Sequence, residues 1–213
     1  PLEEYLGTTT LAFLPNYHGV RLRIGALGGS VDDREEEIRR VVKELRSRAD
    51  TYIFGEGDTK LAEAVGRRLE QRNEMVAVAE SCTGGMLAAA LTDTPGSSAW
   101  FEGGVVTYTN ESKVRHLGVS HDDLAAHGAV SEQVAKQMAS GVRERFGTQW
   151  GIGVTGIAGP GGGSKDKPVG LVWIGISSAE RTYAHRIVLG EHRDSNRQRS
   201  VGVALSLLWR LIS

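Results

Sequence analysis

The sequence has little cysteine, almost no excess charge and no long apolar run, and each of these absences excludes a class of protein. Its single cysteine, Cys82, can form no internal disulfide, and no pair of cysteines is available for a zinc site. Lys and Arg number 25 and Asp and Glu 26, so the formal net charge of -1 argues against binding of nucleic acid through bulk positive charge. No apolar run approaches the ~20 residues of a membrane span, and we find no secretory signal. We therefore expect a cytoplasmic protein without membrane contact.

Glycine, by contrast, is abundant. Of the 213 residues, 28 are glycine, roughly 13% against a usual share of ~7%. Clustered glycines indicate tight turns and close approach of the backbone to a neighbour. Hydrophobic residues make up 40% and charged residues 24%, which is typical of a folded globular chain. The length fits one large domain, or a medium domain with a small one. The first residues include neither a methionine nor a clear structural start, so we expect a piece of a longer protein.

Residues 1–56 predict a small α+β domain. Apolar and polar residues alternate over 20–24, and a turn separates this segment from a short apolar run, which is the pattern of a β-hairpin. The predicted order is strand 11–14, strand 20–24, a helix capped by Asp32 or Asp33, and strand 51–54. A β-β-α-β unit of this size cannot bury a large core, so we expect it to pack on a neighbour.

Residues 57–213 predict a larger α/β domain, with the junction at 55–58. The expected strands are 75–79, 105–108, 150–154, 169–176 and 182–189, and the expected helices are 59–72, 84–91, one capped by Asn110, one capped by Ser131, and 194–211. The strand at 75–79 is continuously apolar, as is typical of a strand covered on both faces. Alternating strands and helices predict a three-layer α/β/α domain with a central mixed sheet.

Ligands of such sheets collect at loops beyond the carboxyl ends of strands. In the loop 80–85, Ser81 follows the buried strand, and small residues would let amides at the helix N-terminus face an anion. The loop could equally be a simple strand-to-helix turn. Cys82 is the alternative nucleophile, but a lone cysteine more often packs, so Ser81 is preferred.

A second loop, 108–113, places a lysine where a structural cation is unfavourable. If Asn110 caps the following helix, Lys113 lies in its first turn, and the positive helix end should lower the pKa of the amine. That environment suits a general base. Lys113 could instead be a solvated helix residue, and Tyr108 an aromatic side chain that packs at the rim of the sheet.

A third loop, 155–163, is rich in glycine and follows a strand. It does not match a phosphate-binding P-loop, because Ser164 separates Gly163 from Lys165, and it could be only a connector. At the start of the last helix, arginines could hold a phosphate or form a solvated face; they are Arg193, Arg197 and Arg199. The six histidines show no metal spacing, so we expect neither a metal nor a cofactor.

Several motifs together resemble the C-terminal domain of the CinA family. In order along the chain they are AESCTGG at 79–85, GSSAWF at 96–101, VTYTN at 106–110 followed by Lys113, HGAVSE at 127–132, and TGIAGP at 155–160 followed by KPVG at 167–170. The resemblance covers residues 58–213. It implies a nicotinamide-nucleotide amidase, which hydrolyses nicotinamide mononucleotide to nicotinic acid mononucleotide and ammonia. It also implies that an N-terminal domain similar to molybdopterin-binding proteins, linked to ADP-ribose pyrophosphatase activity, is missing here, so that activity is not assigned to this chain.

The resemblance implies a role for each site residue. Ser81 would be the nucleophile, Lys113 the base that takes its proton, and Tyr108 a neighbouring hydroxyl that positions or polarises. Amides of the loops at Thr83–Gly85 or Thr155–Gly156 could bind the oxyanion, and Arg197 aligns best with the family's phosphate-binding arginine, with Arg193 one helical turn earlier as the substitute. The full set of expected substrate-binding residues is Thr83, Gly84, Gly85, Asn110, Thr155, Gly156, Ala158, Gly159, Arg197 and Arg193.

The segment 8–54 resembles the small KH-type domain of longer CinA proteins. It contains a formal GXXG at 25–28, the loop that clamps nucleic acid in KH domains. That match lies between a strand and a helix, not between two helices, and no basic cluster surrounds it. We therefore expect a spacer or dimerisation role, with a homodimer as the assembly. Two alternative functions stay open: a nucleotide-binding module without catalysis, and nucleic-acid binding through the small domain.

Overall fold

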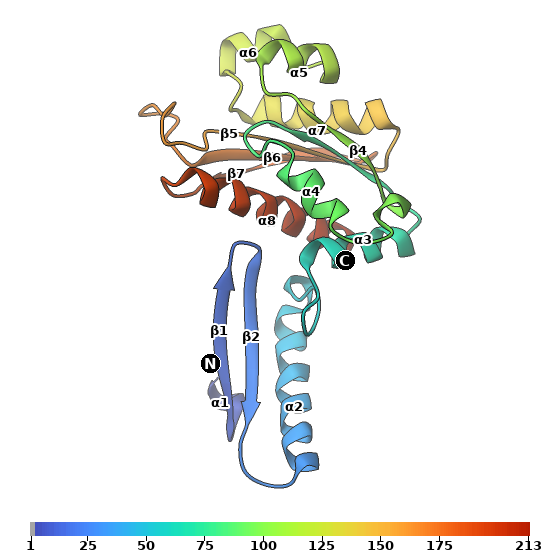
Figure 1. The fold of residues 1–213 in the computed structure, drawn as a ribbon, viewed down its shortest axis with the longest axis vertical. Helices are drawn as coiled ribbons and strands as arrows, with labels where there is room; N and C mark the ends of the chain where they lie inside the picture. The colour runs from blue at the N-terminus through green and yellow to red at the C-terminus, as the bar shows by residue number, and fades with distance from the viewer. Residues whose placement is uncertain (1–2) are drawn as a thin grey trace.

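The computed structural model of the chain describes residues 3–213 and divides them into a small N-terminal region and a larger α/β domain (Figure 1). The small region begins with α1 (Glu3–Leu6) and an antiparallel hairpin of β1 (Thr9–Asn16) and β2 (Gly19–Ala26). Helix α2 (Val31–Ala49) runs alongside the hairpin.

The cap of α2 differs from the predicted one. Ser30, not Asp32 or Asp33, is the N-cap: its hydroxyl accepts from the Asp33 amide at 3.2 Å, and the Asp33 carboxylate accepts from the Ser30 amide at 2.8 Å. This reciprocal pair is a capping box, which places Asp33 in the first turn as the third helical residue.

The predicted third strand at 51–54 is wrong. Helix α2 continues into the short 3-10 helix η1 (Asp50–Tyr52), closed by a hydrogen bond from the Ile53 amide to the Asp50 carbonyl at 2.9 Å. Phe54 then packs against the core of the larger domain. The segment therefore turns Phe54 toward the neighbouring domain and does not extend the hairpin.

The larger domain contains a five-stranded mixed sheet in the order β4-β3-β5-β6-β7. Its strands are β3 (Val76–Glu80), β4 (Phe101–Val106), β5 (Trp150–Gly156), β6 (Leu171–Ser177) and β7 (Thr182–Val188). Strand β3 lies between β4 and β5 and is parallel to both, while the pairs β5–β6 and β6–β7 are antiparallel. All five residues of β3 are buried.

Helices cover both faces of this sheet (Figure 1). One face carries α3 (Leu61–Gln71), α4 (Met86–Thr92) and α8 (Arg193–Ile212). On the other face α7 (Glu132–Phe146) lies against the strands, and α5 (Asn110–Leu117) and α6 (His121–His127) pack on the outer side of α7. The 3-10 helix η2 (Ser97–Ala99) precedes β4. Each face has its own cluster of buried apolar side chains. The predicted three-layer architecture is confirmed; α6 was not predicted.

Three of the 28 glycines, at 151, 153 and 175, allow α7 to pack closely on the sheet. A Cβ added at Gly151 would lie 2.1 Å from the Ala139 carbonyl oxygen, and one at Gly175 would lie 2.1 Å from the Ala135 carbonyl oxygen. Side chains at these positions would force helix and sheet apart, because backbone cannot move aside as a flexible side chain can. The close neighbour indicated by these glycines is therefore a helix.

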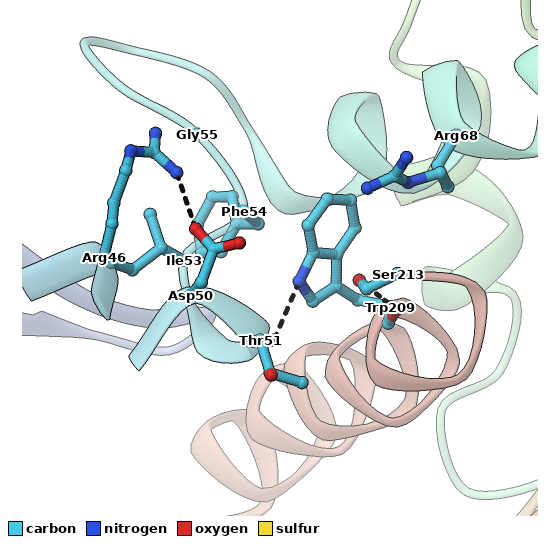
Figure 2. Close-up of a pocket in the computed structure, with 9 residues that line it drawn as sticks. All are labelled: Arg46, Asp50, Thr51, Ile53, Phe54, Gly55, Arg68, Trp209 and Ser213. Carbon is cyan, nitrogen blue, oxygen red and sulfur yellow. Dashed lines mark hydrogen bonds and ion pairs between the residues drawn. The ribbon is translucent and has the colours of Figure 1, made fainter. Parts of the chain in front are cut away.

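The small region contacts α8 at two places. The hairpin tip lies against the middle of α8, where a Cβ on Gly202 would come within 2.5 Å of the Tyr17 carbonyl oxygen. Nearer the helix C-terminus, the Trp209 indole donates to the Thr51 carbonyl at 3.1 Å, and the Arg68 guanidinium stacks on that indole (Figure 2). These side chains border a junction cavity of about 300 Å³. Among residues 3–213, no helix has the length and apolarity to cross a lipid bilayer.

Candidate active site

The carboxyl ends of three neighbouring strands meet at one edge of the sheet. Ser81 directly follows β3, and its amide donates to the Val154 carbonyl in β5 at 2.9 Å. On the other side, the Thr107 amide, just beyond β4, donates to the Glu80 carbonyl at 2.8 Å. The peptide unit that joins Glu80 to Ser81 is thus hydrogen-bonded to both parallel neighbours, which fixes where the serine side chain emerges.

The structure brings Lys113 to Ser81. The Lys113 ammonium nitrogen lies 3.1 Å from the Ser81 hydroxyl oxygen, 2.8 Å from the Thr107 carbonyl oxygen and 3.4 Å from the Tyr108 carbonyl oxygen. The lysine is 1% exposed, and none of these three acceptors is a carboxylate. A buried amine held only by uncharged groups is rare among structural lysines.

The burial of Lys113 changes its acid–base behaviour. Desolvation disfavours the ammonium form and lowers the pKa of this group from its ordinary value. The amine lies in the first turn of α5, whose N-cap is Thr109: the Thr109 hydroxyl accepts from the Ser112 amide at 3.1 Å. The predicted cap, Asn110, is instead the first helical residue and is exposed.

Cys82 lacks the properties of a nucleophile. It is buried, and desolvation, opposed only in part by neighbouring amides, raises the pKa of its thiol to about 11. Because the thiolate is the reactive form of cysteine, this side chain stays protonated and unreactive at neutral pH. The geometry therefore favours Ser81 over its neighbour.

The N-terminus of α4 holds an internal anion. The Glu80 carboxylate accepts from the amides of Gly85 and Leu87 at 3.0 Å and from that of Ala88 at 2.8 Å. The Gly84 amide donates to the Ser81 carbonyl at 3.1 Å. The expectation that amides at this helix end face a ligand anion is therefore wrong for Gly84 and Gly85. Sequence analysis missed Glu80, and no spacing pattern marks it.

The two candidate arginines have different contacts. Arg197 donates to the Thr83 carbonyl at 2.9 Å and is half-buried, so it braces the loop after Ser81. Arg193 is exposed, and it donates to the Gly159 carbonyl at 3.0 Å and to the Tyr108 hydroxyl at 3.3 Å. It therefore connects the second and third loops at the rim. The Tyr108 ring, 61% exposed, projects at this rim and its hydroxyl faces the guanidinium.

The glycine loop is tied to neighbouring elements. The Thr155 hydroxyl donates to the Ala129 carbonyl at 2.8 Å, and the Ala158 carbonyl accepts from the Asn196 amide group at 3.0 Å. A Cβ on Gly156 would lie 2.8 Å from the Leu171 carbonyl oxygen, so that glycine permits close pairing with β6. Val106, which sequence analysis missed, is 50% exposed beside Gly85.

Four buried side-chain atoms of the described residues lack a hydrogen-bond partner, and all belong to this edge of the sheet or to the first turns of α8. They are Thr83 Oγ1, Thr107 Oγ1, Asn196 Oδ1 and Arg197 Nε. Buried polar atoms without partners are uncommon and gather at functional sites. Within residues 3–213, no group of three His, Cys, Asp or Glu side chains is arranged to hold a metal ion.

The fold and this edge define a class: a three-layer α/β/α protein with a buried serine–lysine pair at the carboxyl end of a buried parallel strand, β3. Comparison with known proteins gives the family. The CinA C-terminal domain profile matches residues 58–212, and the profile of the damage-inducible protein CinA KH domain matches residues 1–55. The chain belongs to the CinA family, as the motifs had indicated.

Relatives extend along almost the whole chain. A CinA-like protein from Chlorobium limicola is 49% identical over 208 residues, which cover 94% of this chain and 48% of the relative. A putative competence-damage inducible protein from Halothermothrix orenii is 42% identical over 204 residues, covering 95% of this chain and 49% of the relative. The chain thus spans about half the length of these curated relatives.

Solved structures match the larger part of the chain. The competence/damage inducible protein CihA from Agrobacterium tumefaciens is 42% identical with a TM-score of 0.66, and the match covers 72% of this chain and 97% of that one. A competence-damaged protein (CinA) superfamily protein from Escherichia coli is 32% identical with a TM-score of 0.70, and the match covers 76% of this chain and 97% of that one.

Proposed function

We propose that this chain hydrolyses the carboxamide of nicotinamide mononucleotide to nicotinic acid mononucleotide and ammonia, with Ser81 as nucleophile and Lys113 as general base. One observation carries the proposal: a buried amine without a carboxylate partner lies 3.1 Å from the hydroxyl of Ser81. Serine is a weak nucleophile until an adjacent base accepts its proton, and a desolvated lysine is such a base.

The contacts of Lys113 suit the neutral amine. A neutral amine has two N–H groups and one lone pair. The Thr107 and Tyr108 carbonyls can accept the two N–H groups, which directs the lone pair to the Ser81 hydroxyl. The hydroxyl then donates its proton to the amine as its oxygen attacks the amide carbon.

The remaining steps conserve atoms and protons. Attack gives a tetrahedral oxyanion; the ammonium of Lys113 returns its proton to the departing nitrogen, the C–N bond breaks and ammonia leaves. Water then attacks the acyl-serine, with Lys113 accepting the water proton and returning it to Ser81. Since the amides of Gly84 and Gly85 are engaged within the protein, we assign the oxyanion to the amide of Thr83 or to those of the loop at Thr155–Gly156.

The rim supplies groups that suit the rest of the substrate. The exposed Val106 side chain, which ends β4 opposite Glu80, and the exposed Tyr108 ring beyond it offer apolar surface for an aromatic base. Arg193 presents an exposed guanidinium that can pair with a phosphate. Arg197, which the sequence favoured for the phosphate, is the second candidate because it already donates to the Thr83 carbonyl.

The test is release of ammonia from nicotinamide mononucleotide by the purified chain, with the acid product identified by mass and Ser81→Ala as control. We expect product from the wild type and none from the variant, while calorimetry shows that both bind the nucleotide. Binding without product in the wild type would favour a nucleotide-binding module. If the wild type gave no product and bound no nucleotide, nicotinamide mononucleotide would be rejected as the substrate.

A further inference from the structure

Glu80, the residue immediately before Ser81, has no assigned role, although its environment is unusual. Its side chain is 1% exposed, and its partners are three backbone amides, those of Gly85, Leu87 and Ala88. Burying a carboxylate costs several kcal/mol unless it is paired or well hydrogen-bonded. Three amide donors at the positive end of a helix meet that requirement.

Helix α4 has no other side-chain cap. Its N-cap is Gly85, which has no side chain to accept from the first amides of the helix. Glu80 supplies that cap from outside the helix, across the loop. The carboxylate therefore does for α4 what a serine or aspartate does at an ordinary N-cap.

The same residue anchors the other end of the loop. Glu80 is the last residue of β3 that pairs with both neighbouring strands, opposite Val106 in β4 and Val154 in β5. The loop between β3 and α4 thus starts at the main chain of Glu80 and ends at amides bound by its side chain. Within the loop, the Gly84 amide donates to the Ser81 carbonyl at 3.1 Å, which adds a further hydrogen bond between its two ends.

We propose that Glu80 is a positioning residue for Ser81: by binding both ends of the loop, it keeps the serine hydroxyl within hydrogen-bond distance of Lys113. It also occupies the α4 N-terminus, so the anionic part of a ligand binds elsewhere, at the arginines of α8. This inference rests on the proposed role of Ser81 as nucleophile, but not on the identity of the substrate.

The experiment compares Glu80→Gln and Glu80→Asp with the wild type, and Glu74→Gln is the matched control. Glu74 lies just before the opposite end of β3, where its carboxylate accepts from the Trp150 indole at 2.7 Å and pairs with Arg72. Two readouts are used: the rate at which a fluorophosphonate probe labels Ser81, followed by peptide mass spectrometry, and kcat and KM for nicotinamide mononucleotide across pH.

We expect Glu80→Gln to lower both kcat and the labelling rate roughly 100-fold, because a displacement of about 1 Å between reacting groups can cost that much. The KM should change little, and the pH at which activity is half-maximal should stay the same, because the two carbonyl acceptors of Lys113, those of Thr107 and Tyr108, are unchanged and the amine stays buried. Glu80→Asp retains the charge and should restore part of the rate. Glu74→Gln should behave as wild type in both readouts, whatever it does to the melting temperature.

The outcomes separate the two claims. Wild type that is labelled at Ser81 but releases no ammonia disproves the substrate, while the labelling rates still test Glu80. Labelling of Glu80→Gln at the wild-type rate overturns the positioning role. A rate loss that is matched in size by Glu74→Gln also overturns it, because the loss would then be one of general stability. Wild type that is neither labelled nor active overturns both claims.

Discussion

The two regions of this chain bury apolar surface to very different extents. In the larger domain, buried side chains form a cluster on each face of the sheet. In the described part of the small region, Val41 is the single buried apolar residue, whereas seven of the ten exposed large apolar side chains belong to it: Phe13, Leu14, Tyr17, Val20, Leu27, Val31 and Tyr52. A unit of this size buries too little apolar surface to be more than marginally stable alone. The comparison shows that the serine–lysine pair lies in the region with the dense core, whereas we expect the small region to depend on its contacts with α8.

The largest effect should come from the nucleophile in the dense domain. Ser81→Ala should reduce kcat by at least about 1,000-fold, because it removes the atom that forms the acyl-enzyme. The melting temperature should stay near that of wild type, since only a hydroxyl is lost. Steady-state ammonia release and calorimetric melting check this. Near-normal turnover would transfer the nucleophile role to water or to Cys82.

Lys113→Arg should be nearly as damaging, and comparable to Lys113→Ala. Arginine keeps the charge but stays protonated, so it cannot accept the serine proton. We expect a loss of roughly 100- to 10,000-fold in kcat, with no rescue by divalent ions. A variant with arginine at this position that retained substantial activity would show that charge, not basicity, is what the site requires.

The pH dependence follows from the lowered pKa of Lys113. Activity should rise with pH as the amine loses its proton. The unfolded chain binds this proton more tightly than the folded one, so stability should rise with pH from the folded pKa up to about 10.4, the unfolded value. Lys113→Met should flatten the dependence of stability on pH. The variant should be more stable than wild type at lower pH, where the buried lysine must lose its proton or remain charged, and this difference in stability should shrink as pH rises. Urea unfolding at several pH values measures it; identical slopes in both proteins would contradict the assigned pKa shift.

The exposed rim should give a smaller effect. Arg193→Ala should lower kcat/KM for nicotinamide mononucleotide about tenfold, or about 1.4 kcal/mol. It should barely change kcat/KM for the riboside that lacks the phosphate. The same pair of substrates with Arg197→Ala is the comparison. Equal loss for both substrates would mark the tested arginine as a brace for the loop, while phosphate-dependent loss only in Arg197→Ala would restore the order expected from the sequence.

At the junction, Gly202→Val should destabilise the protein by about 1–3 kcal/mol, the usual cost of overpacking, because the new side chain would meet the Tyr17 carbonyl. Gly190→Ala is the control, since a Cβ there meets nothing within 4 Å. Urea unfolding and proteolysis around 55–60 report on the loosened hairpin. Unchanged stability would mean that the hairpin tip is not held by α8.

The smallest effect should come from the ion pair between the regions. Arg21 lies 3.0 Å from Asp58, but these side chains are 55% and 94% exposed. Surface pairs of this kind contribute little, so Arg21→Ala should unfold within about 0.5 kcal/mol of wild type. A clearly larger loss in urea unfolding would show that charge as well as packing joins the two regions.

Local signals predicted most of the architecture and both members of the serine–lysine pair that the structure brings together. A polar residue after a buried strand identified Ser81, and a lysine in the first turn of a helix identified Lys113, although the cap is Thr109 rather than Asn110. Glu80 could not be found this way, because its role depends on a side chain that reaches amides across a loop. Arg193 and Arg197 lie one turn apart, so helical spacing left both open.

The third strand shows where local propensity fails. The segment 51–54 is rich in aromatic and β-branched residues, which favour strands. Yet Phe54 packs on the core of the larger domain, and Thr51 accepts from Trp209. Tertiary burial outweighed a strand preference that no partner strand was placed to satisfy.

Helix α8 contacts both the candidate site and the small N-terminal region. Its first turns carry Arg193 and Arg197 to the rim of the site, its middle meets the hairpin tip at Gly202, and its last turns hold Trp209. An α-helix is a stiff rod, and the nine residues from Gly202 to Arg193 span about 13 Å. A rotation of the hairpin would therefore change the direction of both guanidinium groups. Because Arg197 donates to the Thr83 carbonyl, the same rotation would also reach the loop after Ser81. A contact at the far side of the small region would thus act on the rim and on the serine loop together.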